Sequence, residues 1–346
     1  MRHSCPVSLP QDVGNTATDV FGGDDGADAR SFLHGVTSIR HASHAGSYTV
    51  GEPGGRSEFA LWKSGDMVTR KSYGKDVCFI IVETDPETET AILKGIEVRL
   101  VADAPFSDLE AVTEEERRDF EAMESRVASE SLRLVQSRRE MDSEKRSLRK
   151  EARFQSSPDF FERPGRVLHL DGDGTYLQKC LNMYQELGIR AIGKHVPEAQ
   201  MPTKVTTLLE EYEPDILIIT GHDGVIRKGK DWADIFNYRN SGHFAKTVTN
   251  ARKHARSMDD LVIIAGACQS HFEALLDAGA NFASSPQRIM IHALDPVFIA
   301  EKIAYTPINE TVNVYDVVRS TYTGTDGVGG LESRGKYRIG LPKSFY

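Results

Sequence analysis

Cysteine is scarce in this chain, and no two cysteines form a metal-binding or redox pair. The four cysteines (Cys5, Cys78, Cys180 and Cys268) are spread over 346 residues without a CxxC motif or a regular spacing. This pattern excludes a disulfide framework and a zinc ribbon, and it favours a reducing compartment. Cys78 and Cys180 lie in apolar patterns, so we expect both to be core residues.

Long hydrophobic runs and an excess of positive charge are also missing. No apolar stretch approaches the ~20 residues of a membrane span, and the N-terminus lacks the basic and apolar regions of a signal peptide. The net charge of −9 and the isoelectric point near 5.7 give no reason to expect a nucleic-acid partner. We therefore expect no nucleic acid, no membrane span and no cofactor, and nothing here indicates the oligomeric state.

The first part of the chain, residues 1–57, is rich in Gly, Ser, Asp and His and has no sustained hydrophobic period. Such a composition buries too little apolar surface to order the chain, so we predict a disordered extension. Its histidines (His3, His34, His41 and His44) lack nearby acidic ligands, which makes a metal cluster the weaker alternative.

Short β-rich runs separated by polar turns follow, in residues 58–106. They are Met67–Arg70, Val77–Glu83, Thr90–Lys94 and Val98–Val101. Strands this short and this close together predict a small SH3-like β-barrel. Residues 107–160 are highly charged, with Ser107 or Asp108 as a helix N-cap, and predict a solvated helical linker in preference to a partner-binding coiled coil.

From residue 161 to 322 the chain alternates between strands and helices. The expected strands are RVLHLDG, RAIGKHV, DILIIT, LVIIAGAC and RIMIHALDP, and an amphipathic segment follows each of them. This alternation predicts an α/β domain with a doubly wound parallel sheet of the caspase or flavodoxin type. Residues 323–346 are expected to form a C-terminal tail laid over the surface as a loop.

Two of these strands end in a reactive side chain. Asp215–Gly224 reads DILIITGHDG and brings His222 to its end, whereas Leu261–His271 reads LVIIAGACQSH and brings Cys268. Uninterrupted aliphatic runs are typical of strands buried on both faces. Because parallel strands end at one edge of a sheet, we expect His222 and Cys268 to lie at the same edge.

This pairing indicates a cysteine nucleophile with a histidine base. At the start of a helix, Cys268 would have a thiolate favoured by backbone N–H groups and by the helix dipole. His222 would act as general base and then as general acid toward the leaving amine. A buried structural cysteine is the alternative, and the matching histidine block argues against it.

The same residues carry a family resemblance. An apolar block ending in His–Gly and a second block ending in Ala–Cys are similar to those of caspase-like (clan CD) cysteine peptidases. A larger set of motifs resembles the YabG family of sporulation-specific peptidases over about four-fifths of the chain, Asp66–Ser344. These motifs are GDMVTRKSYGKD, VLHLDGD, ITGHDG, NYRNS, AGACQSHFEALLDAGANFASSP, HALDPV and IAYTPINETVN.

The resemblance implies an endopeptidase of endospore-forming bacteria. Its partners would be protein substrates, namely spore coat and related spore proteins that are trimmed during maturation. It would act in the mother-cell cytoplasm and in the spore coat, and cleavage after basic residues is implied as well.

One departure concerns the oxyanion hole. Caspase-like enzymes have Gly directly after the catalytic His, but here Asp223 precedes Gly224. We expect the Cys268 N–H as the first oxyanion donor and the N–H of Asp223 or Gly224 as the second. The Asp223 side chain could orient His222, receive a basic substrate side chain, or cap the following turn.

Several other residues are candidates for substrate binding. Asp295, near the end of the expected fifth strand beside His292, could form an acidic specificity pocket or cap a helix. His271 could touch the site or serve a structural role, and Asn237 and Arg239 could line the substrate groove. His169, Asp171 and Asp173 end the first expected strand, and the sequence LDGDGT there could form a cation or phosphate loop, although a turn rich in Asp and Gly is the default interpretation.

Two other classes of function compete with the peptidase. A non-catalytic spore assembly protein would use the same domains only as binding surfaces. A metal-dependent hydrolase would use His222, Asp223 and His271, but it would leave Cys268 without a role.

Overall fold

A computed structural model describes residues 62–153, 161–226 and 231–341. The predicted disordered extension, with its four histidines, lies outside the described residues. Glu58–Tyr346 forms one compact unit by its internal contacts.

A six-stranded sheet in the order β13-β11-β10-β9-β7-β8 forms the centre of the chain's larger part. Its strands are β7 (Val167–Asp171), β8 (Ala191–His195), β9 (Ile216–Thr220), β10 (Val262–Ala265), β11 (Phe282–Ser284) and β13 (Val328–Gly330). The first five run parallel, and β13 pairs antiparallel with β11. The predicted α/β class with a parallel sheet is therefore confirmed.

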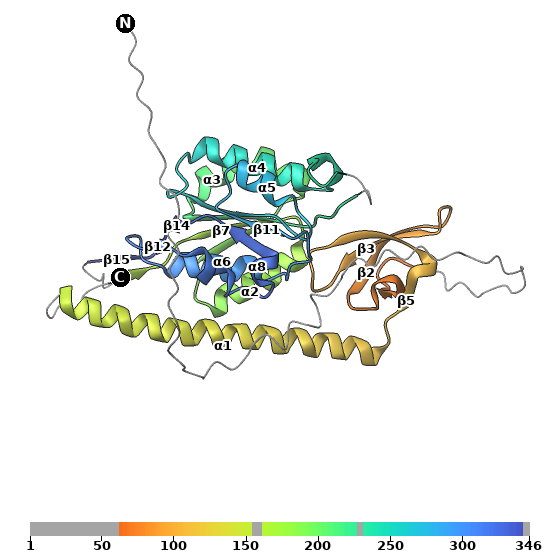
Figure 1. The fold of residues 1–346 in the computed structure, drawn as a ribbon, viewed down its shortest axis with the longest axis horizontal. Helices are drawn as coiled ribbons and strands as arrows, with labels where there is room; N and C mark the ends of the chain where they lie inside the picture. The colour runs from red at the N-terminus through yellow and green to blue at the C-terminus, as the bar shows by residue number, and fades with distance from the viewer. Residues whose placement is uncertain (1–61, 154–160, 227–230, 342–346) are drawn as a thin grey trace, which may run out of the picture. The chain divides into compact units, whose positions relative to one another are not determined.

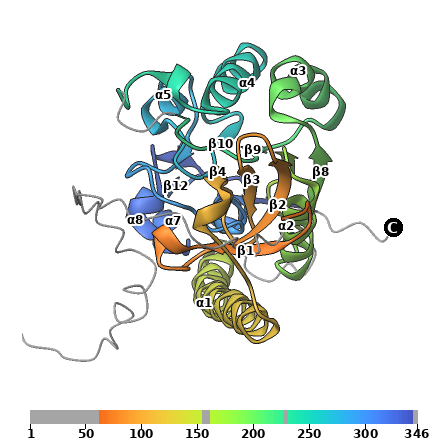
Figure 2. The same ribbon diagram turned by 90° about the vertical axis from the view of Figure 1, so that its right-hand side faces the viewer.

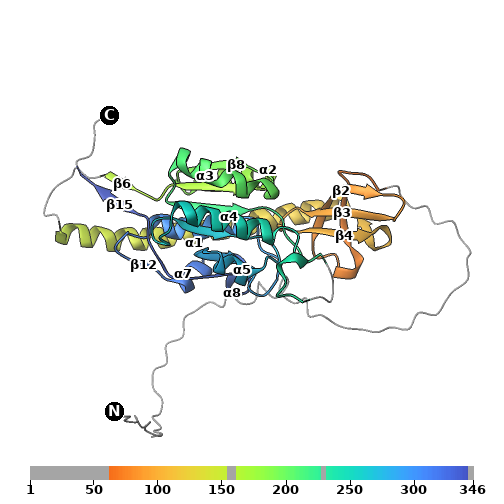
Figure 3. The same ribbon diagram turned by 90° about the horizontal axis from the view of Figure 1, so that it is seen from above.

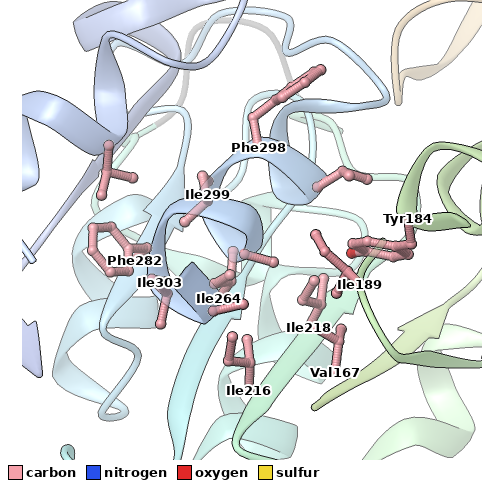
Figure 4. Packing of buried hydrophobic residues seen from close by; sticks show 14 of the residues in the cluster. Val167, Tyr184, Ile189, Ile216, Ile218, Ile264, Phe282, Phe298, Ile299 and Ile303 are labelled. Carbon is pink, nitrogen blue, oxygen red and sulfur yellow. The ribbon is translucent and has the colours of Figure 1, made fainter. Parts of the chain in front are cut away.

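The aliphatic runs explain why β7, β9 and β10 are central strands. Every residue of these three strands is buried, as the absence of polar alternation predicts. On one face, Val167, Ile216, Ile218 and Ile264 pack with Phe298 and with other residues of the core cluster that Figure 4 displays. The strands are thus held by apolar burial on both sides.

Helices cover both faces of the sheet. They are α2 (Gly174–Glu186), α3 (Met201–Tyr212), α4 (Ser241–His254), α5 (Phe272–Asp277), α6 (Asp295–Tyr305), α7 (Val314–Val318) and α8 (Gly324–Gly327). In Figure 1, α3, α4 and α5 lie on one side of the sheet, and α2 and α6 lie on the other. Figure 3 shows α4 between α3 and α5.

The C-terminal third differs from the sequence prediction in three places. The fifth strand is Phe282–Ser284, whereas the predicted run RIMIHALDP forms a loop with an isolated bridge at His292 and then the start of α6. The predicted last helix contains only α7, preceded by the short strand β12 (Thr311–Val312). The expected tail provides β13, the antiparallel edge of the main sheet, and then β14 (Ser333–Arg334) and β15 (Arg338–Gly340).

The short strands near the start form a five-stranded antiparallel sheet in the order β4-β3-β2-β1-β5. In Figure 2 this sheet faces the viewer. They are β1 (Met67–Arg70), β2 (Cys78–Asp85), β3 (Thr90–Gly95), β4 (Val101–Pro105) and β5 (Leu109–Ala111). The predicted strand Val98–Val101 is mostly the connection that precedes β4. No pairing joins β4 to β5 in the described residues, so a closed SH3-like barrel is not confirmed.

Helix α1 (Glu114–Arg153) follows this sheet and carries mostly exposed residues, as a charged linker should. It is nevertheless attached to α6. Val135 is buried in the main core, and Arg138 and Arg139 form ion pairs with Glu301, whose carboxylate is almost fully buried. The helix is therefore a docked element along this part of its length.

We expect Glu301→Gln to lower the free energy of unfolding by about 2–3 kcal/mol, because it removes the buried partner of two arginines. Arg117→Gln, which breaks only exposed pairs at the start of the same helix, should change it by less than about 0.5 kcal/mol. Urea unfolding measures both values. Equal effects would show that Glu301 does not hold α1 in place.

Candidate active site

His222 and Cys268 occupy equivalent positions beyond two adjacent parallel strands. Ile219 of β9 is in register with Ala265 of β10, and each reactive residue lies three positions further along the chain. Neighbouring strands are about 4.8 Å apart, so the two loops leave the same sheet edge side by side. The structure thus brings the two strand ends together, as the sequence indicates.

His222 is held in a polar environment that water scarcely reaches. Its side chain is almost fully buried, and its ring centroid lies 5.4 Å from that of Tyr176. Burial lowers the pKa of His222 to about 4, although the nearby Asp173 carboxylate opposes this shift. The imidazole is therefore neutral at physiological pH, which is the form that can accept a proton.

Asp173 is the carboxylate that faces His222. Its Oδ1 caps α2 by accepting hydrogen bonds from the N–H groups of Thr175 (2.7 Å) and Tyr176 (3.2 Å). Its Oδ2 lies 3.4 Å from His222 Nε2 and forms an ion pair with Lys94. The His222 contact is within ion-pair range but has no hydrogen-bond geometry, since Nε2 makes no hydrogen bond. Asp173 is thus positioned to orient the imidazole or its protonated form.

Glu198 fixes the backbone of His222 from the opposite side. Its Oε1 accepts a hydrogen bond from the His222 N–H at 2.9 Å. A side chain at Gly172 or Gly221 would displace this carboxylate from its present position. The role of Glu198 was not predicted from the sequence. The two glycines at the strand ends are the signal that could have indicated it.

Cys268 lies in the turn after β10, ahead of α5, and is fully buried. The expectation that it begins a helix is wrong. Burial raises the pKa of its thiol to about 12, although the Ile291 N–H donates to Sγ at 3.2 Å. In this closed state the thiol is protonated, contrary to the expected helix-stabilised thiolate.

Asp223 joins the loops that carry the two reactive residues. Its Oδ1 accepts from the N–H groups of Gly224 (2.9 Å) and Asn240 (2.8 Å). Its Oδ2 accepts from the hydroxyls of Ser241 and, at 2.9 Å, Ser270. With both oxygens occupied, the carboxylate links the β9, α4 and β10 ends rather than contacting His222.

This arrangement also bears on the predicted oxyanion donors. The Gly224 N–H is engaged by the Asp223 side chain, so it is less available to a substrate carbonyl than predicted. A Cβ at Gly224 would lie 3.1 Å from the Val101 carbonyl oxygen, which shows how closely β4 approaches this loop. The N–H groups of Cys268 and Asp223 remain the predicted donors.

His271 has a structural position. Its Nδ1 accepts from the Ala274 N–H at 3.3 Å as the N-cap of α5, and its Nε2 lies 2.9 Å from the Ala233 carbonyl oxygen. Both ring nitrogens are therefore used in the local fold. Of the two roles considered for His271, the structure favours the structural one.

The other substrate-binding candidates are also tied into the protein. Asp295 begins α6 and accepts from the N–H groups of Tyr322 (2.7 Å) and His292 (3.2 Å), and burial raises its pKa to about 6. The Asn237 amide donates to the Asp231 carbonyl at 2.8 Å. Arg239 Nη2 lies 3.5 Å from Asp103 Oδ1, on β4.

A buried basic side chain lies at this sheet edge, and sequence analysis did not find it. Arg99 is fully buried and pairs with Asp171 at 2.8 Å. Although burial disfavours the charged carboxyl, Arg99 and then His169 keep the pKa of Asp171 well below its usual range. Asp171 was assigned to a turn, because the sequence gives no sign that a distant arginine reaches it.

The geometry gives little support to a metal-dependent hydrolase. In the described residues, no group of three His, Cys, Asp or Glu side chains is arranged to hold a metal ion. Asp223 and His271, two of the suggested ligands, are committed to protein hydrogen bonds.

In the part of the chain that the structure describes, none of the helices has the length and apolar composition needed to cross a bilayer.

Comparison with known proteins agrees with the motif resemblance. The family described as YabG peptidase U57 matches residues 63–342. The sporulation-specific protease YabG of Bacillus subtilis (strain 168) is 48% identical over 281 residues, which are 80% of this chain and 97% of the relative. A match of this extent covers both sheets, α1 and the site. The chain therefore belongs to the YabG family of sporulation peptidases.

Proposed function

We propose that this protein is a cysteine endopeptidase whose nucleophile is Cys268 and whose general base is His222. The observation that carries the proposal is their equivalent placement beyond register-paired residues of β9 and β10. A thiol and a neutral imidazole at the same edge of a parallel sheet supply the two groups that acyl transfer needs.

In the first half of the reaction, His222 takes the proton of the Cys268 thiol. The sulfur then attacks the carbonyl carbon of the scissile peptide, and a C–S bond forms as the carbonyl becomes an oxyanion. The C–N bond breaks when His222 returns the proton to the leaving nitrogen. An amine product departs, and a thioester remains on Cys268.

In the second half, His222 removes a proton from a water molecule that attacks the thioester. The C–S bond breaks, the acid product leaves, and the proton returns to the thiol. Asp173 faces the imidazole and stabilises the imidazolium that forms in each half, as carboxylates do in other triads. The N–H groups of Cys268 and Asp223 are the proposed donors to the oxyanion.

The described conformation is the closed form of this site. Cys268 is fully buried, and its pKa of about 12 disfavours a thiolate. Before a substrate carbonyl can reach the Cys268 sulfur, the parts of the chain that bury this thiol must move away. A charged, more hydrated neighbourhood then lowers the cost of ionising the sulfur.

Family membership supplies the biological context of the proposal. We infer that the substrates are spore coat and related spore proteins, that the enzyme acts in the mother cell and spore coat, and that it cleaves after basic residues. The parallel sheet with its reactive carboxyl edge supports a caspase-like arrangement. A non-catalytic spore assembly protein is the second candidate, because the closed thiol would also suit a binding role.

Cys268→Ala should abolish peptide cleavage, lowering kcat/KM by at least ~10³-fold, because the nucleophile is removed. Cys78→Ala is the matched control, since Cys78 is also a buried thiol but lies in the five-stranded sheet. Cleavage of a peptide mixture, read by mass spectrometry, measures both. Retained cleavage by a folded Cys268→Ala protein would exclude the proposed nucleophile.

The low pKa of His222 predicts a loss of stability in acid. Below the ordinary histidine pKa of 6.5 the unfolded chain binds a proton that the folded protein accepts only near pH 4. The stability is thus fully present above pH 6.5 and is lost as pH falls toward 4, by roughly 1–2 kcal/mol at pH 5. Urea unfolding in a Cys268→Ala background avoids self-digestion.

His222→Gln in that background should make the decline between pH 6.5 and 5 shallower by roughly 1–2 kcal/mol, and the buried His292 should account for part of the decline that remains. His254→Gln, which removes an exposed imidazole, should leave the decline unchanged. An identical decline in both variants would contradict the assignment of a buried, neutral His222.

A further inference from the structure

The connection between β3 and β4 enters the candidate active site. Val98 forms an antiparallel bridge with His292, and Leu100 forms a parallel bridge with Asp223. His292 follows Ile291, which contacts the Cys268 sulfur through its N–H, and Asp223 follows His222. Arg99, between the two bridged residues, is therefore placed between the loop that carries His222 and the β11–α6 loop, whose Ile291 contacts the Cys268 sulfur.

The backbone of this segment lies at the nucleophile. The Arg99 backbone is close enough to hydrogen-bond the sulfur and so favour its ionised form. The chain turns sharply here, because the Leu100 N–H donates to the Val98 carbonyl oxygen at 2.8 Å across Arg99. The turn is bridged on both flanks, and it directs the Arg99 side chain to the end of β7.

The Arg99 side chain fills a specific pocket. Its Nη1 donates to Asp171 Oδ2 at 2.8 Å, and its Nε and Nη2 donate to the Ala293 carbonyl oxygen at 3.3 and 3.2 Å. The guanidinium carbon lies 5.0 Å from the centroid of the Tyr176 ring, within cation–π range. A carboxylate, a carbonyl and an aromatic face together suit a guanidinium.

The Asp171 carboxylate is also held in place by contacts that do not involve Arg99. It ends β7, whose neighbours β8 and β9 lie on opposite sides, and this is the point where open α/β sheets bind ligands. Its Oδ1 accepts from the Asp173 N–H at 2.9 Å, and His169 Nε2 lies 3.4 Å from its Oδ2. The carboxylate is thus fixed by its own strand and turn.

We propose that Asp171 is the specificity-determining carboxylate of the peptidase site and that Arg99 is its internal occupant, held in the place of a basic substrate side chain. The inference rests on the proposed function and deepens it. A substrate with an arginine before the scissile bond exchanges with residues 98–100, so that its guanidinium replaces that of Arg99 on Asp171. The five-stranded sheet then acts as a built-in competitor for its own active site.

The test compares two quenched fluorescent peptides with the sequence of residues 96–102, IEVRLVA, one unchanged and one with citrulline in place of arginine. Citrulline keeps the shape but removes the charge. The wild-type protein should cleave the arginine peptide at least ~10-fold more efficiently in kcat/KM. Asp171→Asn should reduce this ratio to below about threefold. A peptide mixture analysed by mass spectrometry should show the same loss of cuts after Arg and Lys.

Asp171→Asn leaves Arg99 as a buried unpaired charge and could unfold the site. The double variant Arg99→Gln/Asp171→Asn removes both charges and leaves two polar side chains that can hydrogen-bond, and it should also lose the preference for arginine. Arg99→Gln alone should raise kcat/KM for the arginine peptide several-fold, because the competitor is gone. A purely structural ion pair would instead lower cleavage of both peptides equally in every variant.

Retained arginine preference in either folded variant lacking Asp171 would overturn the inference, while Cys268-dependent cleavage would leave the proposed function intact. Absence of any Cys268-dependent cleavage of the peptide mixture by the wild-type protein would overturn both.

Discussion

The buried ion pair between Arg99 and Asp171 is the contact on which the closed site depends. It joins the five-stranded antiparallel sheet to the carboxyl edge of the parallel sheet, and both side chains are fully buried. Two charges can remain in such a place only when each satisfies the other, because removing one partner of a buried pair costs about 3–5 kcal/mol. The pair therefore ties residues 98–100 to the carboxyl end of β7.

Three further carboxylates position the reactive side chains around this pair. Glu198 fixes the His222 backbone, Asp173 faces its imidazole, and Asp223 ties together the loops after β9 and β10. Each of these carboxylates contacts groups near it, and none of the three forms a hydrogen bond with the Cys268 thiol. The Cys268 thiol at this acidic edge is protonated, because burial and the nearby Asp295 carboxylate raise its pKa.

Much of the fold follows from the apolar periodicity. The uninterrupted runs in β7, β9 and β10 need burial on both faces, which is why these strands and the placement of His222 and Cys268 are predictable. The fifth strand was assigned to RIMIHALDP because it is longer and more apolar than Phe282–Ser284, yet the shorter segment pairs with β10. A strand of three residues is too short to show a hydrophobic period, so the sequence favours the longer run.

The contacts that close the site are much harder to predict. Arg99 and Asp171 are 72 residues apart in sequence, and the high pKa of the Cys268 thiol depends on its complete burial in the folded protein. Asp223 and Asp295 were considered for substrate binding because of their place in the chain, but their oxygens are used by nearby N–H groups and hydroxyls. Such assignments depend on tertiary hydrogen bonds, which a single sequence does not reveal.

A crystal structure of the protein inactivated by a peptidyl arginine chloromethyl ketone tests most directly whether Cys268 is the nucleophile and Arg99 the internal occupant of the site. We expect a thioether between Cys268 Sγ and the inhibitor methylene, with His222 beside it. We also expect the inhibitor guanidinium on Asp171, with Arg99 displaced. Alkylation of another residue would contradict the assigned nucleophile. A Cys268 adduct with Arg99 still paired to Asp171 would contradict the internal occupant.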